Sequence, residues 1–263
     1  MRIVVCVKSV PDTASHIRVN PSSSAIDLDG LTFVMNPYDE FAVEEALRIK
    51  EKHGQAEITA ISVGGNRAKD VLRIALSMGI DRAVHLTDSS FEGLNSQGVA
   101  QVLARAMQKL GFDLILCGKQ AVDMDSAQVG PALAEILGLP QVGVVTKLEF
   151  DSHWQRLRAW RQIEGATEIV ESGIPCVITT QKGLNEPRYP SLRGILAAKK
   201  KEIPEWGPSQ VEPEGKLGPL TSRVQIVGLQ NPPPRIAGRI LEGEVGEKVR
   251  ELVRLLREEA KAI

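Results

Sequence analysis

Short apolar runs alternate with segments of helical periodicity over the first half of the chain. The runs are rich in β-branched residues, as expected for strands that are buried on both faces. They predict strands at residues 2–8, 57–63, 82–86 and 113–117. Apolar residues three and four positions apart predict helices over residues 37–53, 68–78, 97–110 and 126–137. This order predicts an α/β fold with a mostly parallel, doubly wound sheet and helices on both faces.

Capping residues mark the ends of two of these helices. Asn36 is suited to the N-cap of the first helix, with Pro37 at its first position and Gly54 beyond its end. Gly111 ends the third helix. The residues expected to face inward from the second helix are Val71, Leu72, Ile74 and Ala75.

The alternation stops after Val142. Apolar segments at 142–150, 154–163, 167–170 and 176–180 follow one another without long helices, which predicts antiparallel additions to the sheet edge. Beyond Lys201 the composition is typical of a linker, with prolines at 204, 208, 213, 219 and 232–234. From about Gly243 an amphipathic helix is predicted, and either its own domain or a partner subunit must bury its apolar stripe. The stripe consists of Val245, Val249, Leu252, Val253, Leu256, Ala260 and Ile263.

The segment 184–201 lies between these two regions and has an unusual distribution of apolar residues. Pro187 and Pro190 exclude a regular helix or central strand at its start. Tyr189 and Leu192 stand among arginines, as in a loop that docks against another protein. The residues after Gly194 predict a short basic helix. The domain organisation expected is therefore 1–182 for an α/β domain, 183–203 for a docking segment and 204–263 for a C-terminal arm.

Composition and charge limit the partners. The net charge is −1 and aromatic residues make up only 4%, which argues against nucleic-acid binding. No window approaches the roughly 18 consecutive apolar residues of a membrane span, so direct membrane insertion is not expected and a cytoplasmic protein is the default. Cys6, Cys117 and Cys176 lie far apart in apolar runs, which indicates buried thiols rather than a disulfide framework or a metal site.

The carboxyl ends of parallel strands are the expected place for a ligand. Three segments leave those ends, at residues 6–8, 63–65 and 117–130. The third joins a buried strand to a helix start, where free N–H groups and the helix dipole favour phosphate. The alternative is that Asp123, Asp125 and Ser126 only cap the helix. Neither a GxGxxG nor a GxxxxGK[ST] sequence is present.

No set of catalytic residues accompanies this candidate site. The four histidines lie in unrelated places, and Glu44 and Glu45 are expected on a solvated helix face. A nucleotide-shaped site without an acid–base pair or a nucleophile indicates binding rather than turnover.

Several segments together resemble one family. They are Val7–Asp12, Met35–Ala46, the Gly118–Asp123 loop, and Leu184–Tyr189 with Leu192 and the lysines that follow. In order and with few gaps, from Met1 to about Leu241, the chain is similar to the β subunit of electron transfer flavoprotein. The resemblance implies a sheet of the nucleotide α-hydrolase type. It also implies an αβ heterodimer that passes electrons from flavin dehydrogenases, such as acyl-CoA dehydrogenase, to a quinone reductase or similar acceptor.

The resemblance also implies ligands and contacts. FAD is held mainly by the α subunit, AMP has a structural role in the β subunit, and the C-terminal helix contacts the α subunit. The AMP contacts it implies are Cys6, Asn36, Pro37, Tyr38, Asp39, Val63, Gly118, Lys119, Gln120, Ala121, Val122, Asp123, Met124, Asp125, Ser126, Ala127, Gln128 and Val129. The partner-docking residues it implies are Tyr189, Leu192, Arg193 and Ile195, with Leu192 as the anchor.

Two departures from the family pattern bear on these expectations. The run 123–131 is similar to that of electron-bifurcating members, whose β subunit binds a second FAD in place of AMP, although Ser126 replaces a threonine. Gln162 and Ala166 stand where the family usually has glutamate and glycine, so a carboxylate contact to the α subunit is not carried over. Two other classes remain as alternatives. One is a stand-alone nucleotide-binding module, and the other is an adenylyl-transferring enzyme, for which residues 8–13 lack the required pyrophosphate loop.

Overall fold

The computed structural model describes residues 1–20, 25–211, 224, 226–233 and 237–263. Pro213, Pro219 and Pro234 of the predicted linker lie outside these ranges. The chain divides into two units: Met1–Ile17 with Asp27–Val227, and Arg18–Ile26 with Gly228–Ile263.

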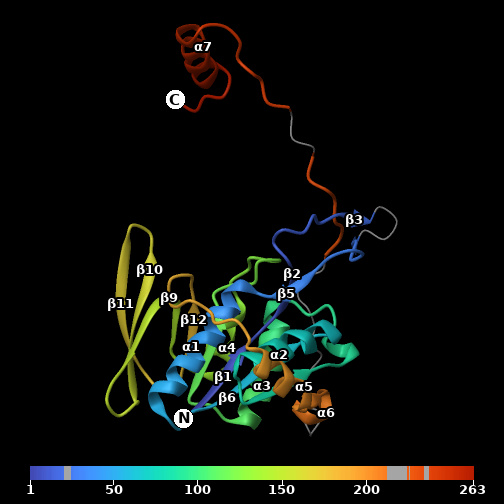
Figure 1. Cartoon of the computed structure of the whole chain (residues 1–263), viewed down its shortest axis with the longest axis vertical. Helices are drawn as coiled ribbons and strands as arrows, with labels where there is room; N and C mark the ends of the chain where they lie inside the picture. Colours follow the sequence, from blue (N-terminus) through green and yellow to red (C-terminus); the bar gives the residue numbers. More distant parts are fainter. Residues whose placement is uncertain (21–24, 212–223, 225, 234–236) are drawn as a thin grey trace. The chain divides into compact units, whose positions relative to one another are not determined.

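Nine strands of the described residues form the main sheet of the first unit, in the order β11-β10-β9-β12-β8-β1-β6-β7-β13. In this sheet order, every neighbouring pair from β9 across to β13 is parallel. Strands β10 and β11 are antiparallel additions at the edge next to β9, as predicted. These two strands form the long hairpin of Figure 1. The strands are β1 (Arg2–Cys6), β6 (Glu57–Val63), β7 (Arg82–Leu86), β8 (Leu114–Gly118), β9 (Gln141–Phe150), β10 (Arg156–Ile163), β11 (Ala166–Gly173), β12 (Cys176–Thr180) and β13 (Glu205–Trp206).

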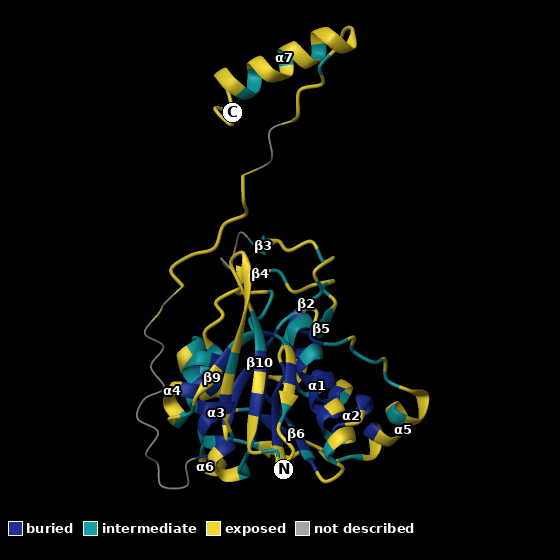
Figure 2. Ribbon diagram, turned by 90° about the vertical axis from the view of Figure 1, so that its left-hand side faces the viewer, coloured by how far each residue is buried: buried dark blue, intermediate teal, exposed yellow. Residues whose placement is uncertain are grey.

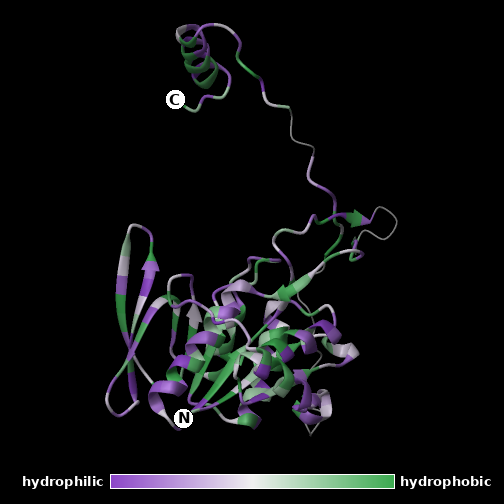
Figure 3. Cartoon of the chain, in the orientation of Figure 1, coloured by the Kyte–Doolittle hydropathy of each residue, from purple (hydrophilic) through white to green (hydrophobic). Residues whose placement is uncertain are grey.

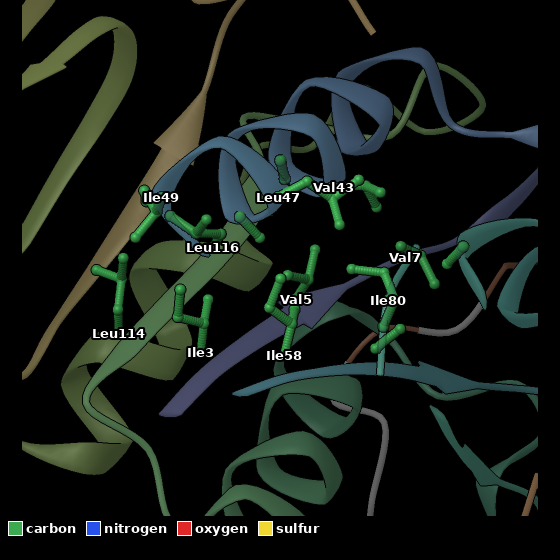
Figure 4. Close-up of a cluster of buried hydrophobic side chains, with 14 of the residues drawn as sticks. Ile3, Val5, Val7, Val43, Leu47, Ile49, Ile58, Ile80, Leu114 and Leu116 are labelled. Atoms are coloured by element: carbon green, nitrogen blue, oxygen red, sulfur yellow. The ribbon is translucent and has the colours of Figure 1, made fainter. Parts of the chain in front are cut away.

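Helices cover both faces of this sheet. On one face α1, α2 and α5 pack over side chains such as Ile3 and Val5, a cluster shown in Figure 4. On the other face α3, α4 and α6 pack over residues such as Val4 and Ile115. The buried residues therefore gather on the central strands and on the inner sides of the helices (Figure 2). The helices are α1 (Pro37–His53), α2 (Asn66–Met78), α3 (Ser96–Leu110), α4 (Val129–Leu137), α5 (Leu192–Lys200) and α6 (Pro208–Val211), and η1 (Ser89–Phe91) is a single 3₁₀ turn.

Several local predictions are confirmed and some are wrong. Gly54 adopts the left-handed conformation at the end of α1, and Cys6, Cys117 and Cys176 are buried free thiols. Ile74 was expected to face inward, but it is 38% exposed because the buried side of α2 is set by its neighbours Val71, Leu72 and Ala75. Residues 205–211, which the sequence assigns to the arm, form β13 and α6 in the first unit. The small β2–β5 pair (Ser9–Pro11, Phe33–Met35) also belongs to this unit.

The second unit contains the β3–β4 pair (Val19–Asn20, Ala25–Ile26) and α7 (Val245–Glu258). The predicted amphipathic helix is confirmed, with the apolar stripe visible on α7 in Figure 3. No residue of α7 is buried, and Val245 and Val249 are 74% and 54% exposed. Within the described residues, no helix combines the length and the hydropathy needed to cross a membrane.

Candidate nucleotide site

A cavity of about 230 Å³ opens at the carboxyl ends of β1, β6 and β8. These strand ends supply its floor, and the loop between β8 and α4 supplies much of its wall. The start of α3 closes another side. The lining residues are Cys6, Val7, Lys8, Asp39, Ile61, Ser62, Val63, Leu94, Asn95, Ser96, Val99, Leu103, Cys117, Gly118, Lys119, Gln120, Ala121, Met124, Ser126, Ala127, Gln128, Val129 and Gly130.

Asn36 attaches the cavity loop to the start of α1. Its side chain is almost fully buried, and its Nδ2 donates to the carbonyl oxygen of Gln120 at 2.9 Å. Its Oδ1 accepts from the N–H of Val122 at 3.1 Å. Asn36 occupies the N-cap position as predicted, yet its side chain makes no capping hydrogen bond to α1. These contacts fix the path of the loop instead.

Asp39 joins three segments that surround the cavity. Its buried carboxylate accepts from the N–H of Lys8 at 2.8 Å, from Gly118 N–H at 3.1 Å and from Asn36 Nδ2 at 2.9 Å. Burial raises the pKa of Asp39 to about 7, and the donors partly oppose this rise. Gly118 is required here because a Cβ atom would collide with the Asp39 carboxylate and would lie 2.7 Å from Tyr38 Cβ.

The loop beyond Gln120 is held by polar contacts and contains backbone strain. Lys8 Nζ donates to both carboxylate oxygens of Asp123, at 2.7 and 2.8 Å. Gln120 Nε2 donates to Asp125 Oδ1 at 2.6 Å. Asp125 and Ala127 have φ values of 48° and 50°, a region that costs non-glycine residues free energy. The surrounding hydrogen bonds must therefore hold the loop in this shape.

The predicted cap of α4 is wrong in its details. The helix begins at Val129 rather than Ser126, and no side chain caps it. Asp125 is engaged by Gln120, and Ser126 Oγ lies 3.1 Å from Ser96 Oγ at the start of α3. The first N–H groups of α4 are thus left for another acceptor.

The starts of α3 and α4 both border the cavity, so two positive dipole ends favour an anion there. Gly130 lets α4 approach the sheet closely, since a Cβ atom would lie 2.5 Å from Thr179 Cγ2 and 3.1 Å from Cys117 Sγ. Lys119 adds positive charge, and its Nζ lies 4.9 Å from the centre of the Tyr38 ring, whereas Asp123 balances the charge of Lys8. This part of the cavity suits a phosphate group.

The deeper wall is apolar, with Ile61, Val63, Val99 and Leu103. It suits a flat, uncharged ring.

The cavity holds two thiols that are poorly suited to nucleophilic chemistry. Burial raises the pKa of the Cys117 thiol to about 12 and also raises the pKa of Cys6. Both thiols therefore stay protonated at neutral pH. No group of three or more His, Cys, Asp or Glu side chains in the described ranges is arranged to hold a metal ion.

The structure brings most of the predicted site residues together. Those that line the cavity are Cys6, Asp39, Val63, Gly118, Lys119, Gln120, Ala121, Met124, Ser126, Ala127, Gln128 and Val129. Six others stand behind the lining, where they support the loop or its neighbours: Asn36, Pro37, Tyr38, Val122, Asp123 and Asp125. The start of α3 was missed, although Asn95 before a periodic segment is a capping signal and its side chain does accept from Gly98 N–H.

Comparison with known proteins agrees with this geometry. The family model described as "Electron transfer flavoprotein domain" matches residues 25–211. The electron transfer flavoprotein subunit beta of Bacillus subtilis is 40% identical over the whole of both chains. That of Sus scrofa is 38% identical over 97% of this chain and 99% of its own length. The chain belongs to the electron transfer flavoprotein family, as a β subunit. This family carries electrons and binds flavin and nucleotide ligands.

The segment 183–203 is the second candidate site of this family member. Tyr189 and Leu192 are 95% and 74% exposed, and the predicted docking residues Arg193 and Ile195 are exposed beside them. Leu196, which the sequence did not single out, is also exposed on α5. Together these residues form an apolar patch with a basic rim.

Glu44 and Glu45 correct a further expectation. They were expected on a solvated face of α1, but they are 5% and 7% exposed. Arg188 and Asn185, from the docking segment, cover them and donate to their carboxylates. The periodicity of α1 could not reveal this, because these partners lie about 140 residues further along the chain.

Proposed function

We propose that the chain forms one half of an αβ heterodimeric electron carrier. In this proposal its cavity binds AMP, and its segment 183–203 docks on flavin dehydrogenases such as acyl-CoA dehydrogenase. A quinone reductase or similar acceptor takes the electrons onward. The relatives' names, as β subunits, support pairing with an α subunit, and the exposed apolar stripe of α7 is a suitable surface for it.

The size of the cavity is the observation that carries the AMP assignment. Its volume of about 230 Å³ lies just below the ~300 Å³ at the lower end of small-molecule sites. A mononucleotide suits such a space better than a second FAD, which has twice the number of nucleotide units. The phosphate-favouring and apolar parts of the cavity also match the two chemical halves of AMP.

Named residues would hold the nucleotide in distinct ways. The N–H groups at the start of α4, Ser126 and Lys119 would bind phosphate, and Val63 and Leu103 would contact the purine. AMP contributes no redox chemistry, so its role here is to stabilise the loop and the helix starts. The FAD of the family accepts and passes on electrons, and the α subunit holds most of it.

The docking role relies on the exposed leucine. Leu192 is mostly exposed on a basic surface that includes Arg193, Lys199 and Lys200. A short-lived electron-transfer encounter uses a small interface, in which one apolar anchor supplies much of the affinity. The basic rim suits an acidic partner surface and increases the association rate.

The alternative is a bifurcating subunit with a second FAD in the cavity. The sequence of the run 123–131 favours it, and Met124, 64% exposed in the cavity loop, would have room to move away from a larger ligand.

Extraction of the ligands from the purified αβ complex separates these proposals. Denatured complex would be analysed by chromatography and mass spectrometry for FAD and AMP. One FAD and one AMP per heterodimer is the expected result. Two FAD without AMP would overturn the AMP assignment in favour of the bifurcating alternative, and one FAD without any second nucleotide would overturn both.

A further inference from the structure

The first half of the docking segment is attached to α1 by an ion pair whose carboxylate, that of Glu44, is buried. Arg188 Nε and Nη2 donate to the two carboxylate oxygens of Glu44 at 2.8 and 2.9 Å. The backbone N–H of Arg188 donates to the same carboxylate at 3.1 Å. Arg188 Nη1 also reaches Glu51 at 2.6 Å, and Asn185 Nδ2 donates to Glu45 at 3.0 Å. The chain is thus fixed immediately before Tyr189.

The second half is attached to α2 and to the link between α2 and β7. Gly194 packs so closely on the carbonyl of Ser77 that a Cβ atom has no space there. Arg73 donates to the carbonyl oxygens of Ala198 and Lys201. Lys201 Nζ in turn donates to the carbonyls of Ile80 and Asp81 at 2.9 and 3.0 Å.

Between these attachments lies the short exposed stretch that carries the predicted anchor. Ser191 caps α5 by accepting from Gly194 N–H at 3.0 Å, so Leu192 is the first residue of a capped helix. Only Tyr189, Pro190 and Ser191 separate it from Arg188, so the direction in which the chain enters α5 is set at Arg188. We infer that Arg188 and Glu44 act as a clamp that positions Leu192 for docking on the dehydrogenase. This inference rests on the docking role proposed above.

The chemistry of the clamp explains why these two residue types are needed. A planar guanidinium binds a carboxylate through two parallel hydrogen bonds, which fixes direction as well as distance. Because Glu44 is buried, it cannot move to follow a misplaced partner. A segment fixed in this way loses less conformational entropy on docking, and the partner binds more tightly as a result.

The test uses the intact αβ complex and the conservative variant Arg188→Lys. Lysine keeps a positive charge beside Glu44 but cannot form the fork, so the fold is retained. The matched control is Arg158→Lys, because Arg158 makes a similar two-nitrogen contact with Glu171 in the β10–β11 hairpin. Each complex would be reduced by acyl-CoA dehydrogenase from the same organism, with the complex as varied substrate, to obtain KM and kcat.

We expect Arg188→Lys to raise KM roughly fivefold, the cost of ordering one or two side chains on docking. The effect falls on KM rather than kcat, because electron transfer within the docked complex uses the same flavins. Arg158→Lys should leave KM unchanged. Hydrogen exchange should become faster at residues 188–195 in Arg188→Lys and stay unchanged over the sheet.

A double-mutant cycle with Leu192→Ala distinguishes positioning from direct contact. If Arg188 acts through Leu192, Arg188→Lys should add no further increase in KM once Leu192 is removed. Full multiplication of the two effects, or an unchanged KM in Arg188→Lys, would overturn the clamp and leave the docking role intact. An unchanged KM in Leu192→Ala alone would overturn the docking role itself.

Discussion

The ionisation of Asp39 tests how burial and hydrogen bonding compete beside the cavity. Three N–H donors favour the carboxylate, whereas burial favours the neutral acid, and burial dominates to give a pKa of about 7 in place of 3.8. The folded chain therefore binds this proton more tightly than the unfolded chain does. The stability it contributes is fully present below pH ~4 and is lost as pH rises to about 7.

The size of this loss follows from the two pKa values. At about 1.36 kcal/mol for each pKa unit, the difference between 3.8 and about 7 corresponds to about 4 kcal/mol. Asp39→Asn removes the titration and keeps the shape. The difference in the free energy of unfolding between the native complex and Asp39→Asn should therefore fall by about 3 kcal/mol from pH 4 to pH 7, and by about 4 kcal/mol over the whole titration. Above pH 8 it should stay constant.

Two measurements on the αβ complex check this. The backbone amides of Lys8 and Gly118 donate to the Asp39 carboxylate, so their NMR chemical shifts should titrate with a midpoint near pH 7. The same amides should show no such step in Asp39→Asn. Thermal unfolding over pH 4–8 supplies the stability difference, at about 2–4 °C per kcal/mol. An amide midpoint below pH 5 would show that the three donors outweigh burial, and the reasoning would fail.

Three further predictions concern the other surfaces. Leu192→Ala truncates a side chain that is 74% exposed in the free chain. Complete burial of a leucine contributes roughly 1.5–3 kcal/mol, so KM for the dehydrogenase should rise roughly 5- to 30-fold in the same reduction assay. An unchanged KM would exclude the anchor role. Gly130→Ala forces a contact with Thr179, so it should cost about 1–3 kcal/mol of stability and weaken binding of the proposed nucleotide. Gly173→Ala, whose added Cβ meets no atom within 4 Å, is the control, and equal thermal midpoints for the two variants would contradict the close packing. Leu252→Asp places a charge on the exposed stripe of α7 and should weaken pairing with the α subunit by gel filtration, whereas an intact heterodimer at micromolar concentration would exclude the stripe from that interface.

The strands and helix ends were predictable where local signals were decisive. Continuous apolar runs bounded by polar residues or turn formers placed β6, β7 and β12 at their observed limits. Gly54 and Gly111 ended α1 and α3 because glycine readily adopts the positive φ found there. These features depend on residues close in sequence, which a single chain displays directly.

Features that depend on distant partners were not predictable. Asp125 and Ser126 have the chemistry of N-caps, yet Gln120 and Ser96 contact them instead, and α4 begins three residues later than expected. The sequence pattern of α1 predicts that Glu44 is solvated, but in the folded chain Arg188 covers it. In each case a local preference was overridden by a contact that only the tertiary structure supplies.

The candidate cavity shows the same division. The rule that ligands bind at the carboxyl ends of parallel strands identified the loop 117–130 from sequence. It did not identify the start of α3, because the order of strands in the sheet determines which loops meet. Strands β6 and β1 separate β7 from β8, so the connection through α3 must cross over them, and its start at Ser96 lies 3.1 Å from Ser126 in the loop after β8.

Helix α1 connects the two candidate sites, because its first turn borders the cavity and its later turns carry the docking segment. Its first turn supplies Asp39 to the cavity, and its next turn supplies Glu44 to the docking segment. Thr180, at the end of β12, reinforces this link by donating to the carbonyl of Tyr38 at 2.8 Å just before the docking segment begins. A helix is stiff over so short a distance, so a nucleotide that orders the first turn of α1 also fixes the surface on which Arg188 rests. If the cavity binds AMP and Leu192 docks as proposed, the nucleotide supports electron transfer without taking part in it, by keeping the support of that leucine in place.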